Sequence, residues 1–234
     1  MLKKLLIVLL ISITTTVISA LSLPKDLIAY DSIEGQQLFA ESDHKQNFWQ
    51  LSQFYTIQQN LTFCGVASSV MVLNALQINP PFDPIYSPYT IFTQDNIFTA
   101  AVLKVLPFYK VRAMGMTLHE LAKLLAVFDL KTEIFYADQV SVEQFKKLAI
   151  QAVSDPKQAI LVNFLRTQLQ QRGDGHISPL AAYDSKSDRF LLLDVARFKY
   201  PAVWIKTIDL YQAMKTLDKE AGKMRGFVII QKHS

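Results

Sequence analysis

The hydrophobic and polar positions along the chain divide it into a mainly helical front half and a strand-rich back half. Capping-box patterns at residues 117–120 and 141–144 precede apolar residues at helical spacing, which predicts helices over 118–128 and 145–153. Short apolar runs predict a strand over 132–136, strands over 158–165, 177–183, 189–195 and 226–232, and a helix near 208–217. Helices followed by strands indicate an α+β fold, in which a helical lobe packs against an antiparallel sheet.

A nearly continuous run of small and apolar residues extends from Val66 to Leu76 and predicts a helix that is buried on most of its surface. The stretch ahead of it, residues 36–57, is rich in aromatic residues and has no regular period, so we expect it to be irregular. Asn60 and Thr62 are capping-type residues and are expected to start the helix. Cys64 should then lie in the first helical turn.

Cys64 is the only cysteine in the chain. At the start of a helix, free N–H groups and the helix dipole favour a thiolate over a thiol, which suits a nucleophile. A lone cysteine is also commonly a small buried hydrophobic residue without chemistry. The nucleophile interpretation therefore requires a base and a group that orients this base.

His176 is the best-placed base among the four histidines, because it follows Gly173-Asp-Gly175 and begins a predicted strand. Residues 184–188 form a polar turn between two predicted strands, and a hairpin folded there pairs residues whose numbers sum to about 370 to 372. In either register His176 and Asp194 lie on one face, directly opposed or two residues apart, and opposed side chains can form a hydrogen bond. Taken singly, His176 could be a core histidine and Asp194 a strand-end aspartate.

Cys64, His176 and Asp194 together supply the nucleophile, base and orienting carboxylate of an acyl-transfer triad. Such chemistry also needs hydrogen-bond donors at the developing oxyanion. Gln58, six residues before Cys64, could act there with the Cys64 backbone N–H, and the spacing alone leaves Gln59 as an equal candidate.

The first 22 residues have the composition of an export signal. Two lysines at positions 3 and 4 precede an apolar run over 5–13 and a more polar tail over 14–22, with cleavage expected after Ala20 or Ser22. A retained membrane anchor is the alternative, but a span needs ~20 apolar residues. We expect export to a bacterial periplasm, with residues 23–234 forming one catalytic domain.

The composition, with 50% hydrophobic and 19% charged residues, is that of a folded globular protein. The basic residues are scattered and the formal net charge is +4, which does not indicate nucleic-acid binding. Residues 119–123 have lysine where a zinc peptidase helix carries its second histidine. We therefore expect no bound metal ion and no bound cofactor.

Three segments resemble the catalytic domain of phytochelatin synthases: Gln58 with residues 63–68 and Asn74, residues 175–179, and residues 193–201. The resemblance extends over residues 24–231 and is strongest to short bacterial members that consist of this domain alone. It implies a papain-like cysteine peptidase fold, with the nucleophile on a helical lobe and His176 and Asp194 on an antiparallel sheet lobe. It also implies that Gln58, and not Gln59, is the oxyanion donor.

By the same resemblance, Asn163, Gly175 and Arg225 hold the substrate, and glutathione is both acyl donor and acceptor. Cadmium or zinc would enter as a thiolate complex of glutathione, and a homodimer is possible. Plant members carry a further cysteine-rich region, which this sequence lacks, so hydrolysis and short products are expected to dominate over long polymers. Two alternatives are a papain-like peptidase that acts on other peptides and a non-catalytic secreted binding protein.

Overall fold

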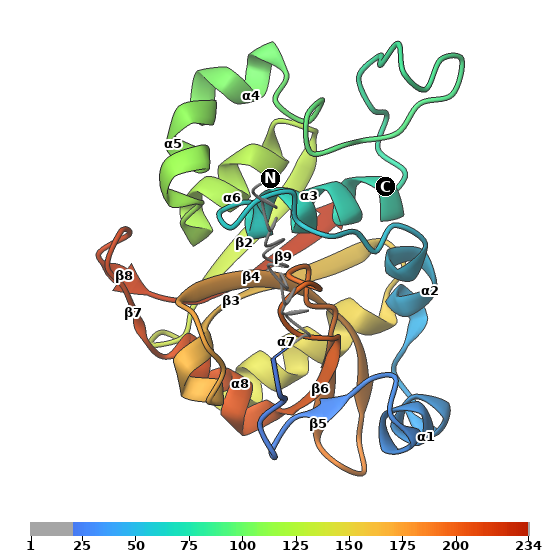
Figure 1. The fold of residues 1–234 in the computed structure, drawn as a ribbon, viewed down its shortest axis with the longest axis vertical. Coiled ribbons are helices and arrows are strands. Elements are labelled where there is room, and N and C mark those ends of the chain that lie inside the picture. The colour runs from blue at the N-terminus through green and yellow to red at the C-terminus, as the bar shows by residue number, and fades with distance from the viewer. Residues whose placement is uncertain (1–20, 234) are drawn as a thin grey trace, which may run out of the picture.

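The computed structural model describes residues 21–233, which form an α+β architecture around a seven-stranded antiparallel sheet (Figure 1). The strand order in this sheet is β1-β6-β5-β4-β3-β9-β2. Its strands are β1 (Ile28–Ala29), β2 (Leu130–Tyr136), β3 (Gln158–Leu165), β4 (Gly175–Asp184), β5 (Arg189–Leu192), β6 (Val203–Lys206) and β9 (Gly226–Lys232). A separate two-stranded hairpin pairs β7 (Leu217–Asp218) with β8 (Lys223–Met224).

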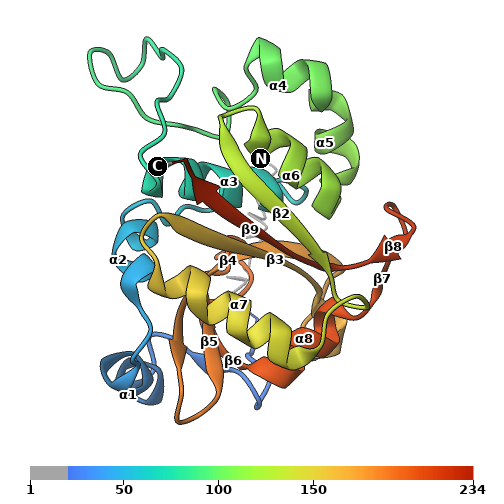
Figure 2. The same cartoon turned by 180° about the vertical axis from the view of Figure 1, so that it is seen from behind.

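Helices cover both faces of the sheet, as the two opposite views show (Figures 1 and 2). The helices are α1 (Ile33–Glu41), α2 (Gln46–Gln53), α3 (Cys64–Ala75), α4 (Ala100–Val105), α5 (Phe108–Met114), α6 (Leu118–Ala126), α7 (Val142–Ser154) and α8 (Thr207–Met214), with a 3₁₀ turn η1 (Arg166–Leu169). Alternate residues of β3 enter two different cores: Leu161 packs with α3 and α6, whereas Ile160 and Val162 pack with α7 and α8. Because both faces of β3 are buried, successive side chains of the strand are all apolar or nearly so.

Most of the predicted back-half elements are confirmed. β3 and β9 have the predicted bounds, and both capping boxes are present, at Thr117 with Glu120 and at Ser141 with Gln144. Two predictions about the bounds of elements are wrong. Residues 36–57 hold most of α1 and all of α2, and β5 ends at Leu192, three residues earlier than expected. Among the described helices, none combines the length and apolar character that crossing a bilayer requires, and the expected export signal lies almost entirely outside residues 21–233.

Helix α3 begins at Cys64, so the predicted position of the cysteine is confirmed, but the predicted cap is wrong. Phe63 is the N-cap and makes no side-chain capping hydrogen bond. Asn60 instead closes a turn before the helix: its Oδ1 accepts from the Thr62 N–H at 3.0 Å and from the Thr62 hydroxyl at 2.7 Å. A side chain that bonds locally in this way is unavailable to the helix. The first N–H groups of α3 therefore have no side-chain cap at Phe63.

A bulge in the β4–β5 hairpin brings His176 and Asp194 onto the same face. Near the turn the pairs are Tyr183 with Phe190 and Ala182 with Leu191, but Leu180 pairs with Leu192, one residue out of step. Because side chains alternate between faces, a one-residue shift moves every later side chain to the other face. Beyond the bulge the Leu193 N–H donates to the Pro179 carbonyl at 3.0 Å. This register places Ser178 opposite Asp194, and His176 is two residues away from that position. The second of the two predicted registers is therefore confirmed.

Candidate active site

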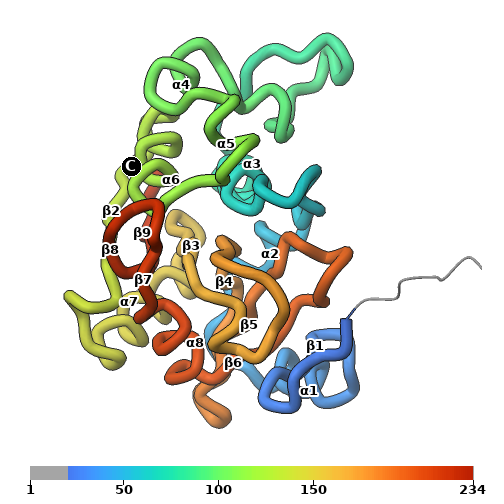
Figure 3. Tube along the Cα trace, turned by 60° about the vertical axis from the view of Figure 1, so that its left-hand side comes forward, coloured from blue at the N-terminus to red at the C-terminus, as the bar shows by residue number. Residues whose placement is uncertain are grey.

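Cys64 lies at the amino end of α3, which packs across the start of β4 (Figure 3). Ser68, one turn into the helix, donates its hydroxyl to the Ile177 carbonyl at 3.1 Å and so ties α3 to β4. Met116 and Ile177 pack closely against Gly65, where an added Cβ would overlap the end of the Met116 side chain. The close approach brings Cys64 and His176 near enough for each group to shift the pKa of the other.

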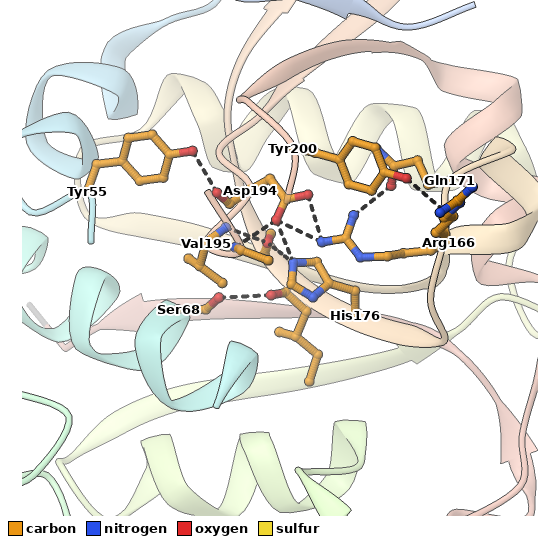
Figure 4. A network of polar contacts seen from close by, with 12 residues as sticks. Tyr55, Ser68, Arg166, Gln171, His176, Asp194, Val195 and Tyr200 are labelled. Atoms are coloured by element: carbon orange, nitrogen blue, oxygen red, sulfur yellow. Dashed lines mark hydrogen bonds and ion pairs between the residues drawn. The ribbon is translucent and has the colours of Figure 1, made fainter. Parts of the chain in front are cut away.

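His176 is buried, and its Nε2 lies 2.8 Å from Asp194 Oδ1 (Figure 4). The Ser178 hydroxyl lies 3.0 Å from the same nitrogen. With Nε2 engaged by these two partners, Nδ1 is the ring nitrogen that remains for the thiol of Cys64. The imidazole is therefore held between a sulfur on one side and a carboxylate on the other, which is the order that general-base activation of a nucleophile requires.

Asp194 is fully buried and receives several donors besides the imidazole. Its Oδ1 accepts from the Ala196 N–H at 2.9 Å and from Arg166 Nη2 at 2.9 Å, and the same Arg166 nitrogen lies 2.8 Å from Oδ2. Tyr55 donates its hydroxyl to the backbone carbonyl of Asp194 at 2.7 Å. A buried carboxylate is stable only when it is paired in this way.

The charges of the three groups shift one another's pKa values. Burial would raise the pKa of Asp194, but the charges of His176 and Arg166 lower it to about 2. Burial would lower the pKa of His176, and the Asp194 carboxylate raises it overall. Burial likewise opposes ionisation of Cys64, yet the hydrogen bond and charge of His176 lower the thiol pKa. These directions favour a thiolate–imidazolium pair.

Cys64 and His176 open into a cavity of about 290 Å³. Among the described residues, its lining is Leu61, Thr62, Cys64, Met114, Gly115, Met116, Thr117, Asn163, Asp174, Gly175, His176, Ile177, Asp218, Glu220 and Arg225. The structure thus brings together five of the seven predicted site residues around one space, with Asp194 directly behind the imidazole.

Four of the residues that line the cavity are charged: Asp174, Asp218, Glu220 and Arg225. The Arg225 guanidinium lies against Gly175, where an added Cβ would be 2.6 Å from Nη2. Arg225 Nη1 donates to the Leu217 carbonyl at 2.7 Å, while its buried Nε has no hydrogen-bond partner among residues 21–233. Asn163 Nδ2 lies 3.4 Å from Asp218 Oδ2. A free guanidinium donor beside acidic side chains can bind a ligand that carries both a carboxylate and an ammonium.

The β7–β8 hairpin and helix α5 both contribute residues to the lining of this cavity, among them Glu220 and Met114. Lys110 of α5 forms an ion pair with Glu120 and lies 3.6 Å from Glu220 of the hairpin. Glu220 also lines the cavity. One lysine therefore links helix α5 to the hairpin.

The two glutamines before the cysteine point to different places. Gln58 is buried, and its Nε2 donates to the Asn60 carbonyl at 2.6 Å. Gln59 is exposed, lines a separate cavity and contacts Asp95 and Gln94. Among the described residues, Gln58 is not in the lining of the cavity that holds Cys64. The geometry favours Gln58 over Gln59 only because Gln59 is turned away.

The sequence analysis missed Arg166 and Ser178, which contact Asp194 and His176 directly. Ser178 could have been found, because it is opposite Asp194 in one of the two registers considered. Arg166 follows a strand and carries no motif, so only the folded chain reveals its partner. Within residues 21–233, no group of three or more His, Cys, Asp and Glu side chains is arranged to hold a metal ion.

Comparison with known proteins was then decisive for the family. The sequence model of the phytochelatin synthase family matches residues 18–227. The chain belongs to the phytochelatin synthase family. The match includes the candidate nucleophile, the imidazole and the carboxylate, so this phytochelatin synthase domain carries the cavity described above.

Three relatives illustrate the extent of the similarity. Glutathione gamma-glutamylcysteinyltransferase 1 of Triticum aestivum is 32% identical over 210 residues, which are 88% of this chain and 41% of the relative. The enzyme of the same name from Lotus japonicus is 33% identical over 208 residues, 88% of this chain and 40% of the relative. The Schizosaccharomyces pombe glutathione gamma-glutamylcysteinyltransferase is 29% identical over 214 residues, 89% of this chain and 50% of the relative. The chain thus spans two-fifths to one-half of the length of these relatives.

Proposed function

We propose that this chain catalyses cysteine-dependent acyl transfer on glutathione, the reaction for which its relatives are named. The observation that supports this most strongly is the composition of one cavity. Cys64 and His176 line it together with Asp218 and Arg225, and the buried Nε of Arg225 has no hydrogen-bond partner among the described residues. A γ-glutamyl group, with its α-carboxylate and α-ammonium, has the complementary charges.

In the proposed first step the Cys64 thiolate attacks the carbonyl carbon of the Cys–Gly bond of glutathione. The C–N bond breaks, and the His176 imidazolium donates its proton to the leaving nitrogen of glycine. The product is a γ-glutamylcysteinyl thioester on Cys64, with neutral imidazole beside it. Asp194 holds the ring so that one nitrogen faces the sulfur and stabilises the imidazolium.

In the second step neutral His176 takes a proton from the acceptor as it attacks the thioester carbonyl. If the acceptor is the amine of a second glutathione, a new amide forms and a short phytochelatin leaves. If the acceptor is water, γ-glutamylcysteine leaves. Cadmium or zinc would take part in this step as a thiolate complex of the substrate.

Donor binding is assigned to three side-chain positions. Arg225 pairs with the γ-glutamyl carboxylate, Gly175 leaves room for the guanidinium, and Asn163 contributes an amide next to Asp218. Gln58 is proposed as the oxyanion donor together with the Cys64 N–H. One hydrogen of the Gln58 amide is used by Asn60, and the other is available. The first N–H of a helix has no intrahelical partner, so that of Cys64 is available as well.

We further propose that the α3–α6 region and the sheet carrying His176 correspond to the two lobes of a papain-like peptidase. The placement of the nucleophile at a helix start, across from a histidine on a strand, supports this assignment. We also propose that residues 1–22 direct export. Amino-terminal sequencing of the protein from a bacterial host tests the latter: a start at Leu21 or Leu23 supports export, and retention of Met1 contradicts it.

The function is tested by glycine release from glutathione and from its α-linked isomer, α-glutamylcysteinylglycine. The isomer has the same Cys–Gly bond and the same charges but places the carboxylate and ammonium differently. Wild-type protein should release glycine from glutathione and much less from the isomer, and Cys64→Ala should release none. Equal cleavage of both compounds, or preference for long peptides, would indicate a general peptidase. Cleavage of none of these peptides would indicate a non-catalytic binding protein.

A further inference from the structure

Arg166 is a charged side chain that contacts the Asp194 carboxylate and that the steps above do not use. It lies in η1, directly after β3, and its side chain is 3% exposed. A buried arginine is costly unless its donors and its charge are paired, so its partners indicate what it is held there to do.

The hydrogen bonds of the Arg166 guanidinium go to Asp194 of the triad and to Gln171, just after η1 (Figure 4). Nη2 donates to Asp194 Oδ1 at 2.9 Å and lies 2.8 Å from Oδ2, and Nη1 donates to Gln171 Oε1 at 2.6 Å. The plane of the guanidinium lies near the rings of Phe164 and Tyr200, whose centroids are 5.8 and 5.3 Å from Cζ. The guanidinium is therefore fixed on all sides and has one ionic partner.

The carboxylate that Arg166 fixes is also the one that orients His176. Asp194 Oδ1 faces Nε2 of the imidazole, while Arg166 Nη2 lies within 2.9 Å of both carboxylate oxygens, so rotation of the carboxylate would break the arginine contacts together with the imidazole contact. Asp194 lies beyond the end of β5, where no ladder hydrogen bond of that strand holds it. The arginine supplies a constraint that the sheet does not.

We propose that Arg166 is a positioning residue, which locks the Asp194 carboxylate so that the His176 imidazole stays aligned with Cys64. The proposal builds on the acyl-transfer function but does not depend on glutathione as the substrate. Arg166 does not border the cavity, so it acts through Asp194 and not through the substrate.

The charge of Arg166 gives the proposal a signature that a packing role lacks. The titratable and charged groups facing His176 are Cys64, Asp194 and Arg166, with Lys199 and Asp174 farther out. Asp194 raises the pKa of His176, whereas Arg166 lowers it. Loss of Arg166 should therefore move imidazolium deprotonation to higher pH, and loss of the Asp194 charge should move it to lower pH.

The test compares Arg166→Met, Arg166→Lys, Asp194→Asn and the double variant Arg166→Met/Asp194→Asn, with Arg189→Met as a control. Arg189 is a surface arginine that donates to the Asp26 carbonyl. Arg166→Met should lower kcat for glycine release about 100-fold with little change in KM, the loss expected for misplacing a reacting group by ~1 Å. Arg166→Lys should fall in between, because lysine keeps the charge but not the planar fork.

The double variant decides whether Arg166 acts through Asp194. Its kcat should equal that of Asp194→Asn alone, because an arginine without its carboxylate has nothing to position. Additive losses would overturn the proposal, as would full activity of Arg166→Met. If Arg166→Met does not fold, the double variant and Arg166→Lys are still compared with Asp194→Asn and the wild type. The double variant removes both charges of the pair and so leaves no lone buried charge.

A second readout needs no glutathione. The rate of Cys64 alkylation by iodoacetamide is measured against pH for each variant. The inflection at higher pH reports imidazolium deprotonation. Its pH should rise in Arg166→Met, fall in Asp194→Asn and stay unchanged in Arg189→Met. An unchanged inflection in Arg166→Met overturns the positioning role. If wild-type protein shows the coupled profile but does not turn over glutathione, the proposed function fails and the role of Arg166 stands.

Discussion

Substitution of Gly175 by alanine should weaken glutathione binding without impairing the chemical step. The added Cβ would lie 2.6 Å from Arg225 Nη2, 3.1 Å from Nε and 3.2 Å from Cζ, whereas ordinary contacts begin at 3.4 Å. The guanidinium must move by nearly 1 Å, away from the position proposed for the substrate carboxylate. A charge-assisted hydrogen bond is worth about 1.5–3 kcal/mol, so its loss should raise KM about 10- to 150-fold.

The assay is the initial rate of glycine release over a range of glutathione concentrations. A loss of ground-state and transition-state binding alike raises KM and leaves kcat unchanged. Gly35→Ala is the matched control, since its Cβ would overlap the backbone carbonyls of Ala29 and Tyr30, far from the cavity. That variant should lower Tm and leave KM unchanged. An unchanged KM in Gly175→Ala would refute the assignment of Arg225 to the substrate carboxylate.

Three further predictions follow from the same structure. Asp194→Asn should lower kcat about 10³- to 10⁴-fold with KM little affected, as for other triads that lose this carboxylate, and a smaller loss would contradict its orienting role. Because the pKa of Asp194 is lowered to about 2, its contribution to stability is complete above the unfolded pKa of ~4 and is lost as the pH falls through ~2. Between pH 5 and pH 3, urea unfolding should therefore show wild-type protein losing about 1 kcal/mol more than Asp194→Asn, and equal losses would refute the ionised state. Lys110→Met removes the contact between α5 and Glu220, which is partly exposed, so KM should rise no more than about fivefold and should depend less on salt than in the wild type. A large fall in kcat would place Lys110 in the chemistry instead.

The regular elements were predictable where local signals are strong. The capping boxes at Thr117 and Ser141 fix their helices through side-chain bonds within four residues, and the buried strands β3 and β9 show as continuous apolar runs. α1 and α2 were not predicted, because their aromatic residues pack against one another and against distant strands without a clear helical period. Tertiary contacts, and not propensity, stabilise those helices.

The residues proposed to react were predictable from the sequence, and the residues that hold them in place were not. The pairing expected for the hairpin placed His176 near Asp194. That the two side chains share a face depends on the bulge between Leu180 and Ala182, and no local sequence pattern indicates this bulge. Arg166 was not predictable, because its partner is 28 residues away and the pairing exists only in the folded chain. The sequence likewise suggested Asn60 as a cap, whereas its side chain closes the preceding turn.

The central claim is that Cys64 becomes covalently acylated by glutathione, and the most direct measurement is mass spectrometry of intact protein mixed briefly with glutathione. The account predicts an adduct of one γ-glutamylcysteinyl unit, located on the peptide that contains Cys64 and absent in Cys64→Ser. It also predicts that a phosphine reductant, which contains no thiol, does not remove the adduct, since the bond is a thioester and not a mixed disulfide. Turnover of glutathione with no such adduct, or an equal adduct in Cys64→Ser, would contradict it.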